Sequence, residues 1–209
     1  MAEITAQAVN EFRKRTGLGL MECKALLKEA DGDSKKAETL AKERGLKNAE
    51  KRAGRAATAG RVEVYIHHDG KSGALVEVNC ETDFVARNEE FRQLAKDLAL
   101  HVVASHPQYA RREEVPADVV AEQRRIFTAQ VADKPEAVRE KIADGKLNAW
   151  YGEVVLTDQP FVKDSTKTVR EVIMGVNART GENISVARFA RFVVGEAAPA
   201  EASSSEGTV

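Results

Sequence analysis

The segment 80–85, Cys-Glu-Thr-Asp-Phe-Val, places an acidic residue beside a bulky aromatic residue. It follows an alternating segment at 74–79 and precedes a helix expected to begin near Asn88. Corners and loops held by rigid elements often carry function. No candidate nucleophile, general base or metal-binding cluster adjoins this corner in the sequence. We therefore expect it to contact another protein rather than to form an active site.

Two interpretations of Phe84 stay open on pattern alone. Its ring could tuck under the following helix, or it could stand out from the surface while Asp83 fixes the turn. An exposed phenylalanine gives up about 2 kcal/mol of burial free energy in the isolated protein. It regains this only when a partner supplies a pocket, as interface anchors do.

Catalytic and metal-binding patterns are weak. His67 and His68 are adjacent on an expected strand, so their side chains should point to opposite faces and could not share a metal. No cysteine or acidic cluster has ligand spacing beside any histidine. The turn 17–19, Gly-Leu-Gly, lacks the third glycine of a phosphate-binding loop and follows no strand. We expect no enzyme, no cofactor and no metal; a hydrolase or metalloenzyme is kept as a rival that a stoichiometric bound ion would support.

The cysteines and the apolar runs bear on the compartment. Cys23 and Cys80 lie far apart, which matches neither a secreted disulfide framework nor a CxxC motif. No apolar run approaches the roughly 20 residues that a membrane span needs. The N-terminus lacks the basic and apolar regions of a secretory signal. These features predict a cytoplasmic protein in a reducing environment, without a membrane partner.

Residues 1–45 are expected to form a small helical domain of three helices. Thr5 is a good N-cap for the first helix, the second should run from about Leu20 to Ala30, and Asp33 can cap the third, which should end near Gly45. Such a short unit buries little surface and should be marginally stable.

Residues 46–60 form an expected basic linker with no apolar stripe. It is either a solvated connector or a contact for RNA or the ribosome through Lys51, Arg52 and Arg55. No aromatic residue is interleaved for base stacking. The whole chain has 32 basic and 33 acidic residues, a formal net charge of -1. We therefore expect no direct nucleic-acid binding.

Residues 61–196 are expected to form a larger α+β core domain. Alternation predicts strands at 61–67, 75–80 and 184–194, which would make a three-stranded antiparallel sheet with helices packed against it. Helices are expected from Asn88, from Pro116 to about 147 with a restart at Pro135, and after a cap at Ser165 or Thr166. Residues 150–156 suggest a short strand or a packed loop. Residues 197–209 are expected to be a disordered tail.

Four motifs resemble the bacterial elongation factor Ts family. The segment 11–26 (EFRKRTGLGLMECKAL) is similar to its opening signature, and 76–86 (VEVNCETDFVA) to its second signature. The segments 159–162 (QPFV) and 191–196 (RFVVGE) also resemble the family. The resemblance runs from about residue 4 to 196 in the family's order. It resembles the short form, with one sheet module and no inserted coiled coil.

The resemblance implies a guanine nucleotide exchange factor. Such a factor binds GDP-bound elongation factor Tu, promotes GDP release by disturbing the magnesium and phosphate site, and is then displaced by GTP. The N-terminal domain would be ubiquitin-associated-like and dock on the partner's nucleotide domain, and the later core would reach a second domain of the partner. The implied docking residues are Arg13, Leu20 and Met21, with Leu20 standing where some relatives carry methionine. The implied residues of magnesium dislocation are Thr82, Asp83, Phe84 and Val85.

The resemblance leaves the oligomeric state open. The short family form can pair as a homodimer through its sheet, and the last strand, 184–194, is apolar enough to contribute. The alternative is that this strand is wholly internal.

Overall fold

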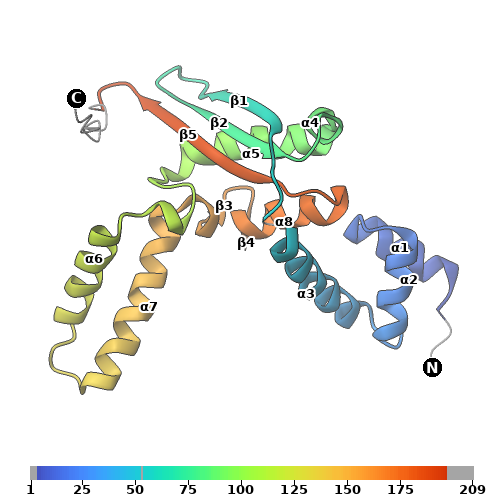
Figure 1. Ribbon diagram of the computed structural model, residues 1–209, viewed down its shortest axis with the longest axis horizontal. Coiled ribbons are helices and arrows are strands. Elements are labelled where there is room, and N and C mark those ends of the chain that lie inside the picture. Colours follow the sequence, from blue (N-terminus) through green and yellow to red (C-terminus); the bar gives the residue numbers. More distant parts are fainter. Residues whose placement is uncertain (1–3, 53, 197–209) are drawn as a thin grey trace, which may run out of the picture.

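Three helices open the chain in the computed structural model, which describes residues 4–52 and 54–196. They are α1 (Ala6–Thr16), α2 (Leu20–Glu29) and α3 (Ser34–Arg52) (Figure 1). The Thr5 hydroxyl accepts a hydrogen bond from the backbone of Ala8, and Gly17 ends α1 in the left-handed conformation at φ 70°. Asp33 accepts hydrogen bonds from the first turn of α3, at 2.8 and 3.1 Å. The three predicted helices and the two predicted caps are confirmed.

The third helix is longer than predicted. It ends at Arg52 and not near Gly45, so the first half of the expected linker 46–60 is helical. The segment 46–52 (LKNAEKR) is rich in strong helix formers, and one interior glycine costs only about 1 kcal/mol. The helix also packs against α8 (Val169–Thr180), and a Cβ built at Gly45 would lie 4.0 Å from the Cβ of Ala178. The contact with α8 therefore stabilises the helix beyond Gly45, where the glycine alone predicted that it would end.

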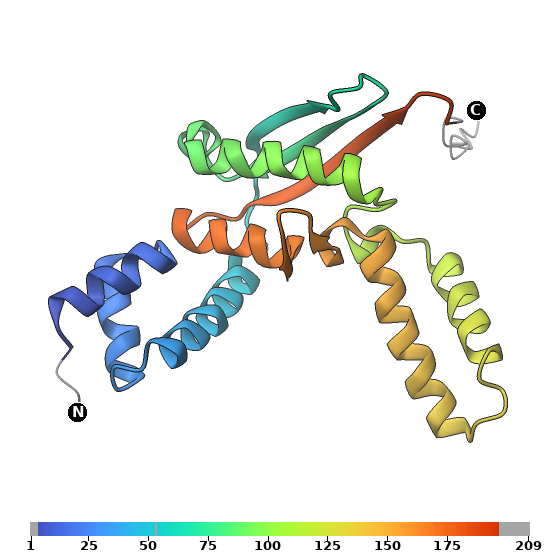
Figure 2. The ribbon, with the colours of Figure 1, turned by 180° about the vertical axis from the view of Figure 1, so that it is seen from behind.

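The α+β class and the three-stranded antiparallel sheet are confirmed. Strands β1 (Ala59–Ile66), β2 (Ser72–Cys80) and β5 (Ser185–Val193) lie in the order β1-β2-β5. Helix α5 (Glu89–Ser105) covers one face of the sheet (Figures 1 and 2). The core between them contains Val76, Val78 and Phe91, all fully buried.

The opposite face of the sheet, here called the outer sheet face, carries apolar side chains that are exposed within the described part of the chain. On β1 the apolar residues Val62, Val64 and Ile66 point to this face. The residues that alternate with them along the strand point inward. The register pairs Val64 with Leu75, and Gly73 with Phe192 on β5. Because β5 is the last strand in the order β1-β2-β5, it is an edge strand that pairs with a neighbour on one side only. It is therefore not wholly internal.

A helical hairpin projects from the sheet unit. It consists of α6 (Ala117–Ala129) and α7 (Glu136–Val154), which pack side by side (Figure 2). The helices expected from Pro116, with a restart at Pro135, are confirmed, and so is the single three-stranded sheet module. The expected strand or loop at 150–156 is wrong, since α7 continues to Val154. Trp150 and Tyr151 pack against the buried pair Val154 and Val155, which keeps the end of this helix in place.

Short elements join the hairpin to α8. They are η2 (Leu156–Asp158), β3 (Pro160–Phe161) and β4 (Asp164–Thr168), and a further short element, η1 (Arg112–Glu114), joins α5 to α6. The predicted caps of α8, Ser165 and Thr166, lie within β4, and the observed N-cap is Thr168. Thr168 is the N-cap because Glu171 stands three residues later, and the two residues form a reciprocal capping box.

A buried histidine connects α5 to the short elements. His101 Nδ1 accepts a hydrogen bond from the backbone of Val162 at 3.1 Å, and Nε2 donates to Gln159 Oε1 at 2.9 Å. The amide of Gln159 donates to the carbonyls of Ser105 and Glu153. These bonds hold the imidazole neutral, and burial lowers the pKa of His101 below its ordinary value of 6.5.

The neutral imidazole makes stability depend on pH. The unfolded chain binds a proton at His101 below about pH 6.5, whereas the folded chain does not until the pH falls further. We expect the free energy of unfolding to fall as the pH drops below 6.5, by at most about 1.4 kcal/mol per pH unit for this one proton. Urea unfolding at pH 7.5, 6.0 and 5.0 measures this, and His101→Asn should show a smaller loss. An equal loss in the variant would contradict the prediction.

No helix in the described ranges 4–52 and 54–196 combines the length and the apolar character needed to cross a bilayer.

Candidate functional site

Phe84 lies on α4 (Asp83–Arg87), a five-residue helix between β2 and α5 (Figure 1). Its side chain is 89% exposed. The interpretation that the ring tucks under the following helix is therefore wrong, and the alternative, a ring that stands out from the surface, is confirmed.

The inner side of α4 is anchored in the core. Ala86 is buried, and Val85 is half-buried against the cluster beneath the sheet. Asn88 ends α4, where its backbone donates to Val85 at 2.9 Å, and its side chain then caps α5 through Glu90 at 2.8 Å. Because the helix is fixed on this side, the ring of Phe84 faces solvent. Thr82 and Asp83 are exposed as well.

Two carboxylates from distant parts of the chain hold the start of α4. Glu182 lies in the turn between α8 and β5, and its Oε2 accepts hydrogen bonds from the backbones of Glu81 and Thr82, at 3.1 and 3.0 Å. Its Oε1 accepts from the Thr82 hydroxyl at 2.5 Å. In return, Glu81 Oε1 accepts from the backbone of Asn183 at 2.7 Å. We call Glu81, Thr82, Glu182 and Asn183 the corner clamp.

Local sequence pattern gives no role to Glu81 or Glu182. The two residues are about one hundred positions apart, and the local turn Gly181-Glu182-Asn183 carries no signal for such a contact. Only the pairing of β2 with β5, which ends at Asn79 and Ser185, brings the two turns together. The strand prediction was the one signal that could have placed them side by side.

The thiol beside the corner is not a nucleophile at neutral pH. Burial raises the pKa of Cys80 to about 11, and the negative charges of Glu182 and Asp83 add to the shift. The thiolate is the reactive form of cysteine. Cys80 is therefore a packed thiol whose Sγ lies 3.3 Å from the carbonyl oxygen of Thr82.

The predicted docking residues are all on the surface. Leu20 and Met21 begin α2 and are 48% and 76% exposed, and Arg13 is exposed near the end of α1. The tight turn between the two helices favours Gly17, because its backbone adopts the left-handed conformation at φ 70°, which side chains with a Cβ rarely adopt. Figures 1 and 2 show these helices at one end of the long axis, with α4 on the side of the sheet that faces that end.

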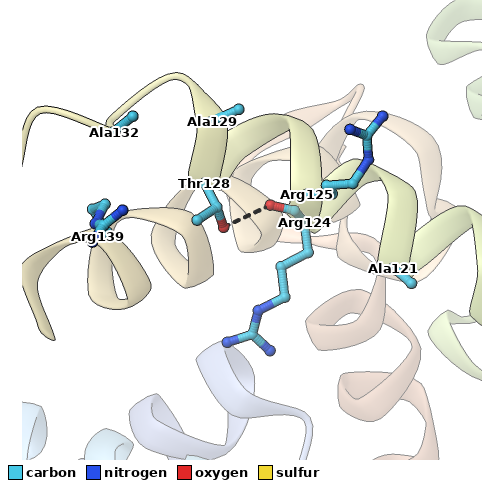
Figure 3. Close-up of a pocket in the computed structure, with 7 residues that line it drawn as sticks. All are labelled: Ala121, Arg124, Arg125, Thr128, Ala129, Ala132 and Arg139. Carbon is cyan, nitrogen blue, oxygen red and sulfur yellow. Dashed lines mark hydrogen bonds between the residues drawn. The ribbon is translucent and has the colours of Figure 1, made fainter. Parts of the chain in front are cut away.

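A pocket on the helical hairpin offers no convergent chemistry. Its lining includes three arginines (Figure 3). Arg124 and Arg125 point in different directions in this view, and they pair with Asp144 and Glu122 respectively. The one hydrogen bond drawn between the lining residues joins the Thr128 hydroxyl to the Arg124 carbonyl. Nothing here positions a nucleophile against a base.

The histidine pair differs from the prediction. Strand β1 ends at Ile66, so His67 and His68 lie in the turn, and their ring centroids are 4.2 Å apart. They do not point to opposite faces. Within residues 4–52 and 54–196, no three histidine, cysteine or acidic side chains gather in a group that could hold a metal ion.

Comparison with known proteins identifies the family. The profile described as "Elongation factor TS" matches residues 21–196. Elongation factor Ts of Anaeromyxobacter sp. (strain Fw109-5) is 54% identical over 198 residues, 94% of this chain and 90% of the relative. Elongation factor Ts of Geobacter sulfurreducens is 52% identical over 195 residues, 92% of this chain and 90% of the relative. The chain belongs to the elongation factor Ts family.

Proposed function

We propose that this protein releases GDP from elongation factor Tu by inserting Phe84 beside the nucleotide site. Its family role is that of a translation elongation factor of the nucleotide-exchange class, which catalyses no chemical reaction. The finer mechanism is our proposal: it binds the GDP-bound GTPase, disturbs the magnesium and phosphate site, and is displaced by GTP. The observation that supports it most is the 89% exposure of a phenylalanine on an anchored helix.

The physical basis is thermodynamic linkage. A factor that binds the nucleotide-free GTPase more tightly than the GDP-bound form must weaken GDP binding by the same factor. Phe84 needs no proton or electron transfer for this, because its ring only has to occupy a pocket that opens in the nucleotide-free form. Magnesium neutralises much of the phosphate charge, so displacing its ligands loosens GDP further.

The other three corner residues have supporting roles in this proposal. Asp83 occupies the first turn of α4, where a negative charge is favourable with the helix dipole. Val85 packs inward and fixes the helix, and Thr82 joins α4 to the corner clamp. The aromatic ring thus makes the contact, while its neighbours set its direction.

We further propose that residues 1–45 act as a ubiquitin-associated-like docking domain and that 61–196 form the core domain. Arg13, Leu20 and Met21 would contact the nucleotide domain of elongation factor Tu. Their exposure is consistent with this role. Docking brings α4 to the nucleotide site, and the two surfaces then act on one partner domain.

The direct test is release of fluorescent GDP from elongation factor Tu, with and without this protein. We expect release to accelerate with the concentration of the protein and to saturate. Bovine serum albumin at the same concentration serves as the control for nonspecific effects. Release that is unchanged at saturating protein would overturn the proposed function.

We also propose that two copies pair through the outer sheet face. The face presents Val62, Val64 and Ile66 on β1 and Phe192 on β5, all exposed in the single chain. Exposed apolar patches of this kind often mark protein interfaces. A second copy would present the same strands, so the interface would be self-complementary.

Charge on this face should separate the copies. We expect Val64→Glu to raise the dimer dissociation constant at least tenfold, because a carboxylate would be buried against apolar side chains. Sedimentation equilibrium across a range of concentrations measures it, with Val138→Glu on the helical hairpin as the control. A wild-type protein that stays monomeric at all concentrations would contradict the dimer.

We propose that the chain works in the cytoplasm and binds no nucleic acid directly. Within the expected linker, Arg55 pairs with Glu81 at 3.5 Å, and its carbonyl accepts from Asn183 at 3.1 Å, so this arginine is engaged within the chain. The rival is an RNA-binding module. Its mark would be RNA binding with a steep salt dependence that disappears when Lys51, Arg52 and Arg55 are replaced.

A further inference from the structure

The helix that carries Phe84 cannot orient itself. Isolated helices shorter than about 12–15 residues are marginal in water, and α4 has five residues. Its N-cap, Thr82, makes no side-chain hydrogen bond to the helix it precedes. Something outside the helix must therefore define its first turn.

The carboxylate of Glu182 supplies that support. It accepts from two consecutive backbone N–H groups, those of Glu81 and Thr82, and takes the Thr82 hydroxyl that would otherwise cap the helix. Hydrogen bonds to an ionised acceptor are roughly twice as strong as neutral ones. The bond from the Asn183 backbone to Glu81 closes the clamp from the other side.

The corner clamp is not what brings the two turns together. Strands β2 and β5 are already paired up to Asn79 and Ser185, immediately before the clamp residues. Without the Glu182 carboxylate the sheet should keep its register, and the two turns should stay adjacent. What would be lost is the fixed geometry of the peptide groups that lead into α4.

We propose that Glu182 is a positioning residue for nucleotide exchange, which acts through α4 by holding Phe84 in the direction that the partner's pocket requires. This inference rests on the proposed function, in which Phe84 makes the contact. Glu182 itself need not touch the partner. Its removal should therefore lower the maximal rate of GDP release and leave the affinity of docking unchanged.

The test measures fluorescent GDP release from elongation factor Tu with the full-length chain carrying Glu182→Ala, Phe84→Ala, or both. Asp164→Ala is the matched control, because Asp164 also accepts from a backbone N–H and a threonine hydroxyl, both of Thr166, but lies on β4. For Glu182→Ala we expect a maximal rate about tenfold lower, or about 1.4 kcal/mol of activation free energy. The half-saturating concentration should stay within about twofold, and Asp164→Ala should match wild type.

The double variant separates positioning from a general loss of structure. If Glu182 acts through Phe84, adding Glu182→Ala to Phe84→Ala should slow release no further. Glu182→Gln, which keeps one acceptor oxygen and the side-chain volume, should recover part of the rate. It also provides the measurement if the alanine variant does not fold.

Each contrary outcome has a distinct meaning. A normal rate for Glu182→Ala alongside a slow Phe84→Ala would overturn the positioning role and leave the proposed function standing. A normal rate for Phe84→Ala would overturn both. A double variant slower than Phe84→Ala, or a raised half-saturating concentration for Glu182→Ala alone, would show that Glu182 does not act through Phe84 and would overturn the inference.

Discussion

Phe84→Ala should slow the maximal rate of GDP release from elongation factor Tu by about 30-fold or more. Truncating an interface anchor typically costs at least about 2 kcal/mol, which is a factor of about 30 in rate when the contact is made in the transition state. Because the ring is 89% exposed in the isolated chain, its removal takes little packing from the fold. Stopped-flow fluorescence at saturating factor measures the rate, and thermal unfolding should give an unchanged midpoint.

Two controls make the Phe84 result specific. Phe84→Trp keeps a large aromatic ring and should keep most of the activity. Val138→Ala removes another exposed apolar side chain, on the distant helical hairpin, and should release GDP at the wild-type rate. Wild-type kinetics for Phe84→Ala at every concentration would remove Phe84 from the mechanism.

The exposure of Phe84 illustrates what local pattern can decide and what it cannot. The caps at Thr5 and Asp33 depend on a few neighbouring residues, and strand β2 depends on alternation over nine consecutive residues. The caps and the strand were therefore predictable from local sequence. Helix α4 spans fewer than two turns, and so few positions give no reliable periodicity to tell which side is buried. The sequence therefore left both orientations of the ring open. The anchoring of Val85 and Ala86 beneath the helix, together with the corner clamp at its start, selects one.

Contacts between distant segments account for the other differences. Glu182 reaches Glu81 across about one hundred residues, and α3, which packs against α8, continues past Gly45. On β1 the alternation was read correctly, but its apolar residues lie on the face away from α5. Alternation shows that a strand has two different faces and does not show which face the covering helix takes. Residues 197–209, expected to be a disordered tail, lie outside the described residues.

Met21→Glu should weaken docking on elongation factor Tu and leave the maximal rate of GDP release intact. Met21 is 76% exposed, so the substitution should remove little packing energy from the folded chain. A negative charge in the first turn of α2 is also favourable with the helix dipole. At the partner's surface the same carboxylate would have to be desolvated against an apolar contact. We expect the half-saturating concentration to rise by about 30-fold, the scale of one lost interface anchor.

The contrast between Met21 and Phe84 is what distinguishes docking from exchange. A residue that contributes equally before and during GDP release changes the concentration needed, whereas one that acts only as GDP leaves changes the maximal rate. Met21→Leu keeps an apolar side chain and should dock normally, as Leu20 is expected to do beside it. If Met21→Glu lowered the maximal rate while the half-saturating concentration stayed the same, the N-terminal helices would take part in exchange itself, and their assignment as a docking domain would be wrong.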